Sequence, residues 1–140
     1  MQVLVANIGP TGVNIAFDPP NPIATQTAVS FTGSGSDPDG TLVAWAWDFG
    51  DGAAASGQNV THTFADGLNN YSITVDLVDE DGTFLDAANA LSVQIDNVAP
   101  TIAISGNASV NEGSIYTLTL GAITDPGLDT VTSERVAIKI

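Results

Sequence analysis

One short run of the sequence specifies both a strand and the turn that ends it. Trp45, Trp47 and Phe49 occupy alternate positions, and a period of two places all three side chains on one face of a β-strand. Gly50-Asp51-Gly52 follows directly, and glycine adopts the positive φ angles that tight turns require. The run therefore predicts a strand with a broad aromatic face that ends in a turn at residues 50–52.

The residues before this strand complete a longer motif. Ser36-Asp37-Pro38-Asp39-Gly40 predicts a turn, and residues 36–52 together read S-D-P-D-G-T-L-x-x-W-x-W-D-F-G-D-G. This pattern resembles the polycystic-kidney-disease (PKD) domain family, whose fold is an immunoglobulin-like β-sandwich. The resemblance implies an all-β chain of this sandwich type. It also implies a structural role for the motif residues Trp47, Asp48, Phe49, Gly50, Asp51 and Gly52.

The charge of the chain excludes two classes of partner. The 140 residues include 16 Asp and Glu, but only Arg135 and Lys139 are basic. Nucleic acids and anionic membrane surfaces bind clusters of cationic side chains, so neither is an expected partner. No apolar stretch approaches the roughly 18 residues of a membrane-spanning helix, so membrane insertion is not expected either. The carboxylates between residues 2 and 134 must face water, accept hydrogen bonds from backbone N–H groups, or bind metal.

A sequence match about ninety residues apart indicates an internal repeat. Residues 7–11 and 97–101 both read Asn-x-x-Pro-Thr. Thr27–Phe31 precedes the Asp-Pro turn of the first copy, and Tyr116–Leu120 precedes Thr124-Asp125-Pro126-Gly127 in the second. These matches predict tandem copies of one module.

The repeat predicts three segments. Residues 1–9 are interpreted as the end of a preceding repeat, with 2–8 as its last strand. Residues 10–98 form a complete PKD-like domain, and residues 99–140 form the N-terminal part of a second one, an incomplete β module. The complete unit is expected to hold six or seven strands, because the longest predicted one can break: near 13–17, 27–33, 42–49, 59–65, 70–79 and 84–96. About forty residues cannot close a sandwich, so the last segment is expected to pair at an edge of the first unit, to exchange with another chain, or to stay mobile.

Alternation along the strands predicts the core. The predicted inward-facing aliphatic side chains and Tyr71 are Val29, Tyr71, Ile73, Val75, Leu77, Leu91, Val93 and Ile95. The aromatic members of the core are Phe31, Trp45, Trp47, Phe49 and Phe64. Phe84 lies near a predicted loop, and we expect it to be the best exposed aromatic for stacking on a sugar ring.

The acidic turns are the candidate metal site. Asp37 and Asp39 lie in the first turn, and Asp79 and Asp81 lie before Gly82 at the end of another strand. Ca²⁺ takes six to eight oxygen ligands from carboxylates, carbonyls and water. Some PKD domains bind calcium in the loop that matches residues 36–40, so the resemblance implies Asp37 and Asp39 as ligands. The alternative is that these Asp side chains only accept hydrogen bonds from their own turns.

No catalytic constellation is visible in the sequence. His62 is the only histidine, and it matches the family's H-x-[YF] strand, where its role is structural. The acidic residues cluster in turns rather than around a cleft, which argues against a glycosidase pair. Serine nucleophile elbows, phosphate-binding glycine loops and zinc motifs are absent. We therefore expect a chain that is not an enzyme.

The sequence leaves two candidate functions. The first is an extracellular or cell-surface spacer or adhesion module of a bacterial tandem-repeat protein, stiffened by calcium, whose partners are neighbouring repeats. Residues 1–3 carry no basic signal-peptide region, so any secretion signal is expected outside this sequence. The alternative is a module that binds a polysaccharide or a protein and is attached to a secreted hydrolase, with Phe84 as a contact residue.

Overall fold

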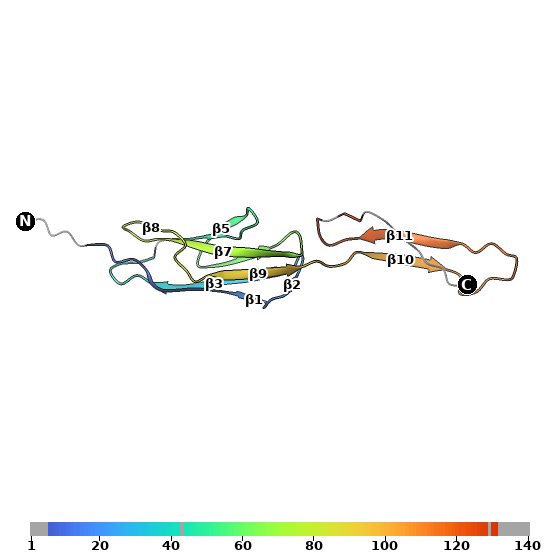
Figure 1. Ribbon diagram of the computed structural model, residues 1–140, viewed down its shortest axis with the longest axis horizontal. Coiled ribbons are helices and arrows are strands. Elements are labelled where there is room, and N and C mark those ends of the chain that lie inside the picture. The colour runs from blue at the N-terminus through green and yellow to red at the C-terminus, as the bar shows by residue number, and fades with distance from the viewer. Residues whose placement is uncertain (1–5, 43, 129, 132–140) are drawn as a thin grey trace, which may run out of the picture.

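The structure is a computed structural model that describes residues 6–42, 44–128 and 130–131. Every regular element in this part of the chain is a β-strand (Figure 1). The strands are β1 (Thr11–Asp18), β2 (Ile23–Ala24), β3 (Ala28–Ser36), β4 (Ala44–Asp48), β5 (Ala54–Ser56), β6 (Asn59–Thr63), β7 (Asn69–Val78), β8 (Thr83–Phe84), β9 (Leu91–Asp96), β10 (Thr101–Gly106) and β11 (Leu118–Thr124). The described residues contain no helix with the length and apolar character needed to cross a membrane.

The first nine strands form an immunoglobulin-like sandwich, which confirms the predicted all-β fold class. One sheet has the order β1-β3-β6. The other has the order β2-β9-β7-β4-β5, with β8 pairing at the end of β7. Apart from the short parallel pair β2 and β9, the pairing in both sheets is antiparallel. The aromatic strand β4 therefore lies inside its sheet, between β5 and β7.

The two sheets bury the aromatic face of β4. Trp45, Trp47 and Phe49 are 6%, 1% and 1% exposed, whereas the intervening residues of β4 point to solvent. The Phe31 ring from β3 lies 5.8 Å from the Trp47 ring and 5.1 Å from the Phe49 ring, measured between centroids. A Cβ atom at Gly33 would overlap the Trp45 ring, so glycine is required where that indole crosses β3. This aromatic layer joins the two sheets.

The turn after β4 has the geometry that its glycines predict. Gly50 and Gly52 have φ angles of 74° and 91°, which other residues adopt only with strain. A Cβ atom at Gly50 would also lie 2.7 Å from the Ser72 carbonyl oxygen. Asp48 Oδ1 accepts a hydrogen bond from the Gly50 N–H at 2.8 Å, and Asp51 Oδ1 accepts one from the Ala53 N–H at 2.9 Å. These two carboxylates and two glycines together shape the turn that ends β4.

The predicted strands and core agree with the structure apart from short elements. The predicted strand at 84–96 breaks into β8 and β9, as its length allowed. β2 and β5 were not predicted, because two or three residues without an alternating pattern carry no periodic signal. Every predicted core residue is buried except Tyr71 and Leu91, which are half-buried. The buried apolar residues are Ile15, Ile23, Val29, Phe31, Trp45, Trp47, Phe49, Phe64, Ile73, Val75, Leu77, Val93 and Ile95.

The last two strands form a separate hairpin. β10 and β11 pair only with each other in a two-stranded sheet, and Figure 1 shows them beyond one end of the sandwich. They therefore do not extend an edge of the first unit, which was one of the three expectations for this segment. At the other end, residues 6–8 lie in no strand, so the strand predicted over 2–8 is wrong for these three residues. Residues 2–5 and 132–140 lie outside the described part of the chain.

Candidate functional site

The two acidic turns come together with the N-terminal linker, which we define as residues 6–10. The first turn follows β3 and the second follows β7, and the linker precedes β1. Asp39 Oδ2 accepts a hydrogen bond from the Ile8 N–H at 2.8 Å. Glu80 Oε2 accepts one from the Thr41 N–H at 3.0 Å. The Asp39 carboxylate thus connects the linker to the first turn, and the Glu80 carboxylate connects the second turn to the first.

Glu80 lies in the acidic turn predicted before Gly82, but it was not among the candidate metal ligands. Its carboxylate lies so close to Gly40 that a Cβ atom there would overlap it. Asp37 interacts with both Asp39 and Glu80, and we call these three residues the acidic cluster. The only sequence signal for Glu80 was its place between Asp79 and Asp81, which says nothing about which turn its side chain contacts.

The acidic cluster raises the pKa of the Asp37 carboxyl above its ordinary value. Partial burial of the carboxyl is the first cause, followed by a hydrogen bond shared with the Asp39 side chain and by repulsion from the charges of Asp39 and Glu80. These effects outweigh a hydrogen bond from the Asp39 backbone N–H, which acts to lower the pKa. Asp37 Oδ1 is buried and accepts no hydrogen bond from the described residues. Asp37 Oδ1 is therefore a carboxylate oxygen that could still accept a hydrogen bond or bind a cation. It lies in a region where negative charge is unfavourable.

Asp79 and Asp81 belong to the second turn rather than to the acidic cluster. Asp79 is 4% exposed, and its Oδ1 accepts hydrogen bonds from the Asp81 N–H at 2.8 Å and the Gly82 N–H at 2.7 Å. Its Oδ2 is buried with no partner among the described residues. Asp81 takes part in this turn through its backbone N–H, and it is exposed to solvent. Asp79 thus shapes the turn that positions Glu80.

The donor chemistry of this region suits a hard cation, although the side chains alone do not form a complete site. Buried carboxylate oxygens without hydrogen bonds, at Asp37 and Asp79, are the kind of ligand that Ca²⁺ takes. Within the described ranges, no three Asp, Glu or His side chains are grouped closely enough to hold a metal ion. Backbone carbonyls and water would therefore supply most of the six to eight ligands.

Phe84 is not an exposed aromatic, so the expectation of a sugar-stacking platform at this residue is wrong. Phe84 is half-buried, and a Cβ atom at Gly9 would lie 2.7 Å from its Cε1. The N-terminal linker thus passes directly against the ring, a contact between distant residues that strand patterns cannot reveal. Tyr116, at 43% exposed, is the exposed aromatic side chain.

His62 has the structural role that its motif predicts. Its ring stacks on Phe49 with centroids 4.2 Å apart and meets the edge of Phe64 at 4.6 Å. His62 Nε2 lies 2.7 Å from Asp51 Oδ2. Burial acts to raise the pKa of Asp51, but the hydrogen bond and charge of His62 and the Ala53 N–H outweigh it and lower the pKa. The pair thus joins the turn after β4 to β6.

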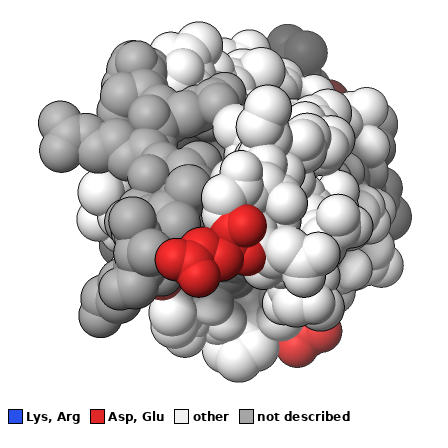
Figure 2. Space-filling model, turned by 90° about the vertical axis from the view of Figure 1, so that its right-hand side faces the viewer, with Lys and Arg blue, Asp and Glu red and all other residues white. Residues whose placement is uncertain are grey.

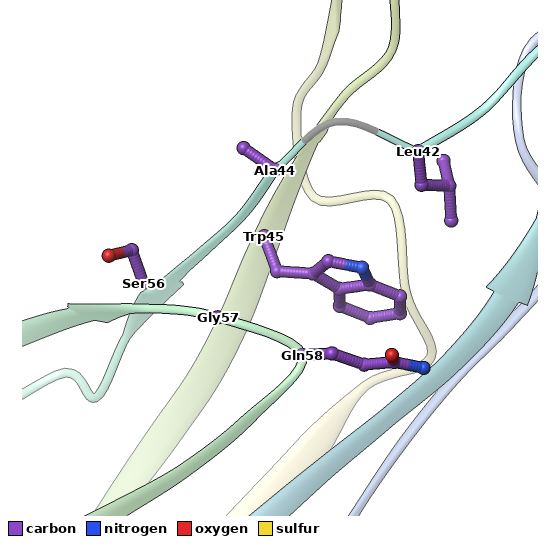
Figure 3. Close-up of a pocket in the computed structure, with 6 residues that line it drawn as sticks. All are labelled: Leu42, Ala44, Trp45, Ser56, Gly57 and Gln58. Carbon is purple, nitrogen blue, oxygen red and sulfur yellow. The ribbon is translucent and has the colours of Figure 1, made fainter.

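One hollow lies beside the aromatic layer, where the indole of Trp45 forms part of its wall (Figure 3). Its volume is about 440 Å³, and its lining residues are Leu42, Ala44, Trp45, Ser56, Gly57 and Gln58. These six side chains include no acid, base or nucleophile that is activated by a neighbouring base. Trp45 is also 6% exposed, so it offers an edge rather than an open ring face.

Comparison with known proteins identifies the family. The sequence profile described as "PKD domain" matches residues 13–93, which is more than half of the chain. The chain belongs to the PKD domain family. PKD domains are typically extracellular modules and are generally not catalytic.

Two solved structures with TM-scores above 0.5 agree with this fold. The PKD1 domain of Vibrio anguillarum Epp is 24% identical with a TM-score of 0.52, over 65% of this chain and 98% of that one. A chain from a study of carbohydrate-binding modules of the β-sandwich superfamily is 18% identical with a TM-score of 0.56, over 81% of this chain and 54% of that one. The PKD1 domain of the Vibrio cholerae metalloprotease PrtV is 21% identical with a TM-score of 0.49, over 60% of this chain and 94% of that one.

Proposed function

We propose that this PKD chain is a non-catalytic extracellular spacer or adhesion module of a tandem-repeat protein, and that calcium stiffens its N-terminal linker. The observation that carries the proposal is the attachment of the linker to the acidic turns. Asp39 accepts a hydrogen bond from the Ile8 N–H, and Gly9 lies against Phe84. A linker that is held at two successive residues transmits orientation from one module to the next.

Calcium is supported by the unused oxygens of the two turns. Asp37 and Asp39 are the proposed carboxylate ligands, with Asp79 Oδ2 as a further oxygen on the second turn. Arg135 and Lys139 are the only Lys or Arg residues in the sequence, so the turns have no basic side chain near them in sequence. A bound divalent cation would neutralise carboxylates that otherwise repel one another. The linker would then be bound to turns whose carboxylates repel one another less.

Thermal unfolding with calcium and with a chelator tests this proposal. We expect the melting temperature (Tm) of the chain to rise by several degrees in millimolar Ca²⁺ relative to EGTA, because a ligand that binds only the folded state at about 100 times its Kd stabilises by about 2.7 kcal/mol. The double variant Asp37→Asn/Asp39→Asn should lose this rise. Asp18→Asn should keep it, because Asp18 is an exposed residue of β1.

Calcium binding and the spacer role are tested by different measurements, and the hydrodynamic radius is a second measurement for calcium binding. If Ca²⁺ changes neither the Tm nor the radius of the chain, the calcium part of the proposal is wrong. The spacer role is tested by joining two copies of residues 6–128 and measuring the end-to-end distance by energy transfer. A broad distance distribution in both Ca²⁺ and EGTA would contradict a stiff spacer.

The hollow beside Trp45 supports a second candidate, a module that binds a polysaccharide or a protein and accompanies a secreted hydrolase. The hollow is open to solvent, and the side chain of Gln58 lies beside the Trp45 indole in its lining. Co-sedimentation with insoluble polysaccharides and a glycan array would detect such binding. Binding that is lost in Gln58→Ala would favour this function, and failure to bind in both assays would favour the spacer.

A further inference from the structure

Each sheet of the sandwich has an open strand edge. β1 lies at the end of the order β1-β3-β6, so only one of its two edges pairs with a strand of the described chain. β9 pairs with β2 only at Ile95 and Asp96, so its earlier residues have no strand on that side in the part of the chain that the structure describes. An open edge exposes N–H and C=O groups that can pair with a strand of another chain.

The side chain of Asn89 covers the open edge of β1. The Ile15 N–H donates to Asn89 Oδ1 at 2.7 Å, and Asn89 Nδ2 donates to the Ile15 carbonyl oxygen at 3.3 Å. These groups of Ile15 point away from β3, because its partner Gly33 donates its own N–H to the Gln58 carbonyl, just before β6. Two hydrogen-bonded residues of an antiparallel ladder exchange the same two bonds. The amide of Asn89 thus takes the place of one residue of a strand beside β1.

The side chain of Asn21 covers the open edge of β9 in the same way. Asn21 Oδ1 accepts a hydrogen bond from the Gln94 N–H at 2.8 Å, and Asn21 Nδ2 donates to the Ser92 carbonyl oxygen at 3.0 Å. β2 runs parallel to β9 with Ile23 opposite Ile95. The same register, continued by two residues, places Asn21 opposite the residue between these two bonded groups. The backbone of a parallel strand would form the same two bonds there, so the amide of Asn21 continues the pairing of β2 along β9.

The two asparagines are arranged reciprocally between the sheets. Asn89 precedes β9 in the sequence and binds β1, whereas Asn21 follows β1 and binds β9. A side-chain amide suits this role because, like a peptide group, it presents both an N–H donor and a carbonyl acceptor. An ionised aspartate at either position would lack the donor, and its second oxygen would face a carbonyl oxygen. The residue type as well as the position therefore favours pairing with the backbone.

The features that usually protect strand edges are scarce in this chain. Lysine is a common one, but the only Lys and Arg residues are Lys139 and Arg135, which lie outside the described residues. Figure 2, a view onto one end of the molecule, shows acidic side chains and no basic ones on the described surface. β1 has a register shift between Thr11 and Asn14, which disrupts pairing only at its beginning. Asn89 therefore covers the part of β1 that the register shift does not.

We propose that Asn21 and Asn89 are edge caps, side chains that keep the sandwich from pairing through its open edges with a second copy of this chain. When the caps are removed, the edge of β1 in one copy would pair antiparallel with the same edge in another copy, about a two-fold axis. The affinity of such strand addition comes from main-chain hydrogen bonds, so two identical copies suffice. This inference goes beyond the spacer role and does not depend on calcium.

Sedimentation velocity of the full chain across a concentration series tests the proposal. We expect wild type to stay monomeric, whereas the double variant Asn21→Ala/Asn89→Ala should form dimers in a reversible, concentration-dependent equilibrium. Alanine removes both amides without adding a charge or a large apolar surface. Asn14→Ala is the matched control, because Asn14 is an exposed residue on the face of β1 rather than at its edge, and this variant should stay monomeric.

Hydrogen exchange shows whether the dimer forms through this edge. In the dilute double variant, the Ile15 amide should exchange at least about fivefold faster than in wild type, because it has lost its hydrogen-bond acceptor. At high concentration its protection should return, since a second copy then pairs with β1. A purely structural role of the amides would speed exchange equally at every concentration. A dimer in which the Ile15 amide stays unprotected would contradict pairing at β1.

The folded state of each variant is checked by the fluorescence of the buried Trp45 and Trp47. If the double variant does not fold, Asn89→Ala alone opens the edge of β1 and should form the same dimer. A folded variant that stays monomeric at every concentration would overturn the proposal, and so would a wild type that associates as strongly as the variant.

Discussion

Asp51 shows what a single carboxylate does in a chain with almost no basic side chains. Its two oxygens have separate tasks, since Oδ1 accepts the Ala53 N–H and Oδ2 contacts His62. The His62 ring is in turn stacked on Phe49. The Asp51–His62 contact is the one ion-pairing arrangement among the described residues. The turn after β4 is therefore held by side chains as well as by its glycines.

The lowered pKa of Asp51 predicts a pH dependence of stability. A carboxyl whose pKa is lower in the folded state stabilises the fold above its unfolded pKa, about 3.9, and loses this contribution as the pH falls through the folded pKa. Asp51→Asn keeps an oxygen for the Ala53 N–H but loses the charge beside His62, and solvent screens this exposed pair, so it should lower the free energy of unfolding by about 0.5–1 kcal/mol at pH 5. The difference from wild type should shrink below pH 4. Urea unfolding of wild type and Asp51→Asn from pH 2.5 to 6 measures it, and a deficit for Asp51→Asn that does not vary with pH would contradict the prediction.

The sequence predicts residues whose partners are close along the chain. Asp48 and Asp51 could be placed because each accepts a hydrogen bond from an N–H two residues later. The contact of Phe84 with Gly9 and that of Glu80 with Thr41 could not, because both depend on how distant loops pack. Local hydrogen bonding leaves a sequence pattern, whereas loop packing leaves none.

At the scale of elements, the carboxylates of the acidic turns after β3 and β7 have two opposite effects on stability. The turns need Asp and Glu oxygens as acceptors for backbone N–H groups. The same carboxylates repel one another, and this repulsion contributes to the raised pKa of Asp37. A raised folded pKa means that ionised Asp37 lowers the stability of the fold, and that this loss develops as the pH rises through the folded pKa.

The effect of Asp37→Asn should therefore depend on calcium. In EGTA at pH 7 we expect this variant to have a higher Tm than wild type, because the amide removes one charge from the acidic cluster. The gain should disappear at low pH, where wild-type Asp37 is protonated. In millimolar Ca²⁺ the order should reverse, because wild type keeps the proposed ligand. Differential scanning fluorimetry in both buffers measures this, and an unchanged order in Ca²⁺ would contradict calcium binding at Asp37.

Elements with a long alternating pattern were predictable, and short ones were not. β3, β4 and β7 were found because their buried residues recur every second position. β5 and β2 consist of three and two residues, and they are strands only because β4 and β9 offer hydrogen-bonding edges. The sandwich was implied by the resemblance of the aromatic motif to the PKD family, whereas the separate pairing of β10 with β11 required the structure.

At the scale of the whole molecule, net charge is the dominant electrostatic feature. The formal net charge is −14 over 140 residues, and most of the acids lie on the sandwich. Such a chain gains stability when mobile ions screen its self-repulsion. Screening and site-specific calcium binding act in the same direction, so they must be separated by experiment.

Ionic strength separates the two effects. Raising NaCl from 10 to 150 mM in EGTA shortens the Debye length from about 30 Å to about 8 Å, so the Tm should rise by several degrees for a repulsion of about 1 kcal/mol. CaCl₂ at equal ionic strength should raise the Tm further, and Asp37→Asn should remove only that additional part. MgCl₂ at the same concentration controls for divalent screening, because Mg²⁺ keeps most of its water and suits a rigid octahedral site. A Tm that does not respond to NaCl would mean that the carboxylates are too far apart to repel, and the rise in Ca²⁺ would then be due to the bound ion alone.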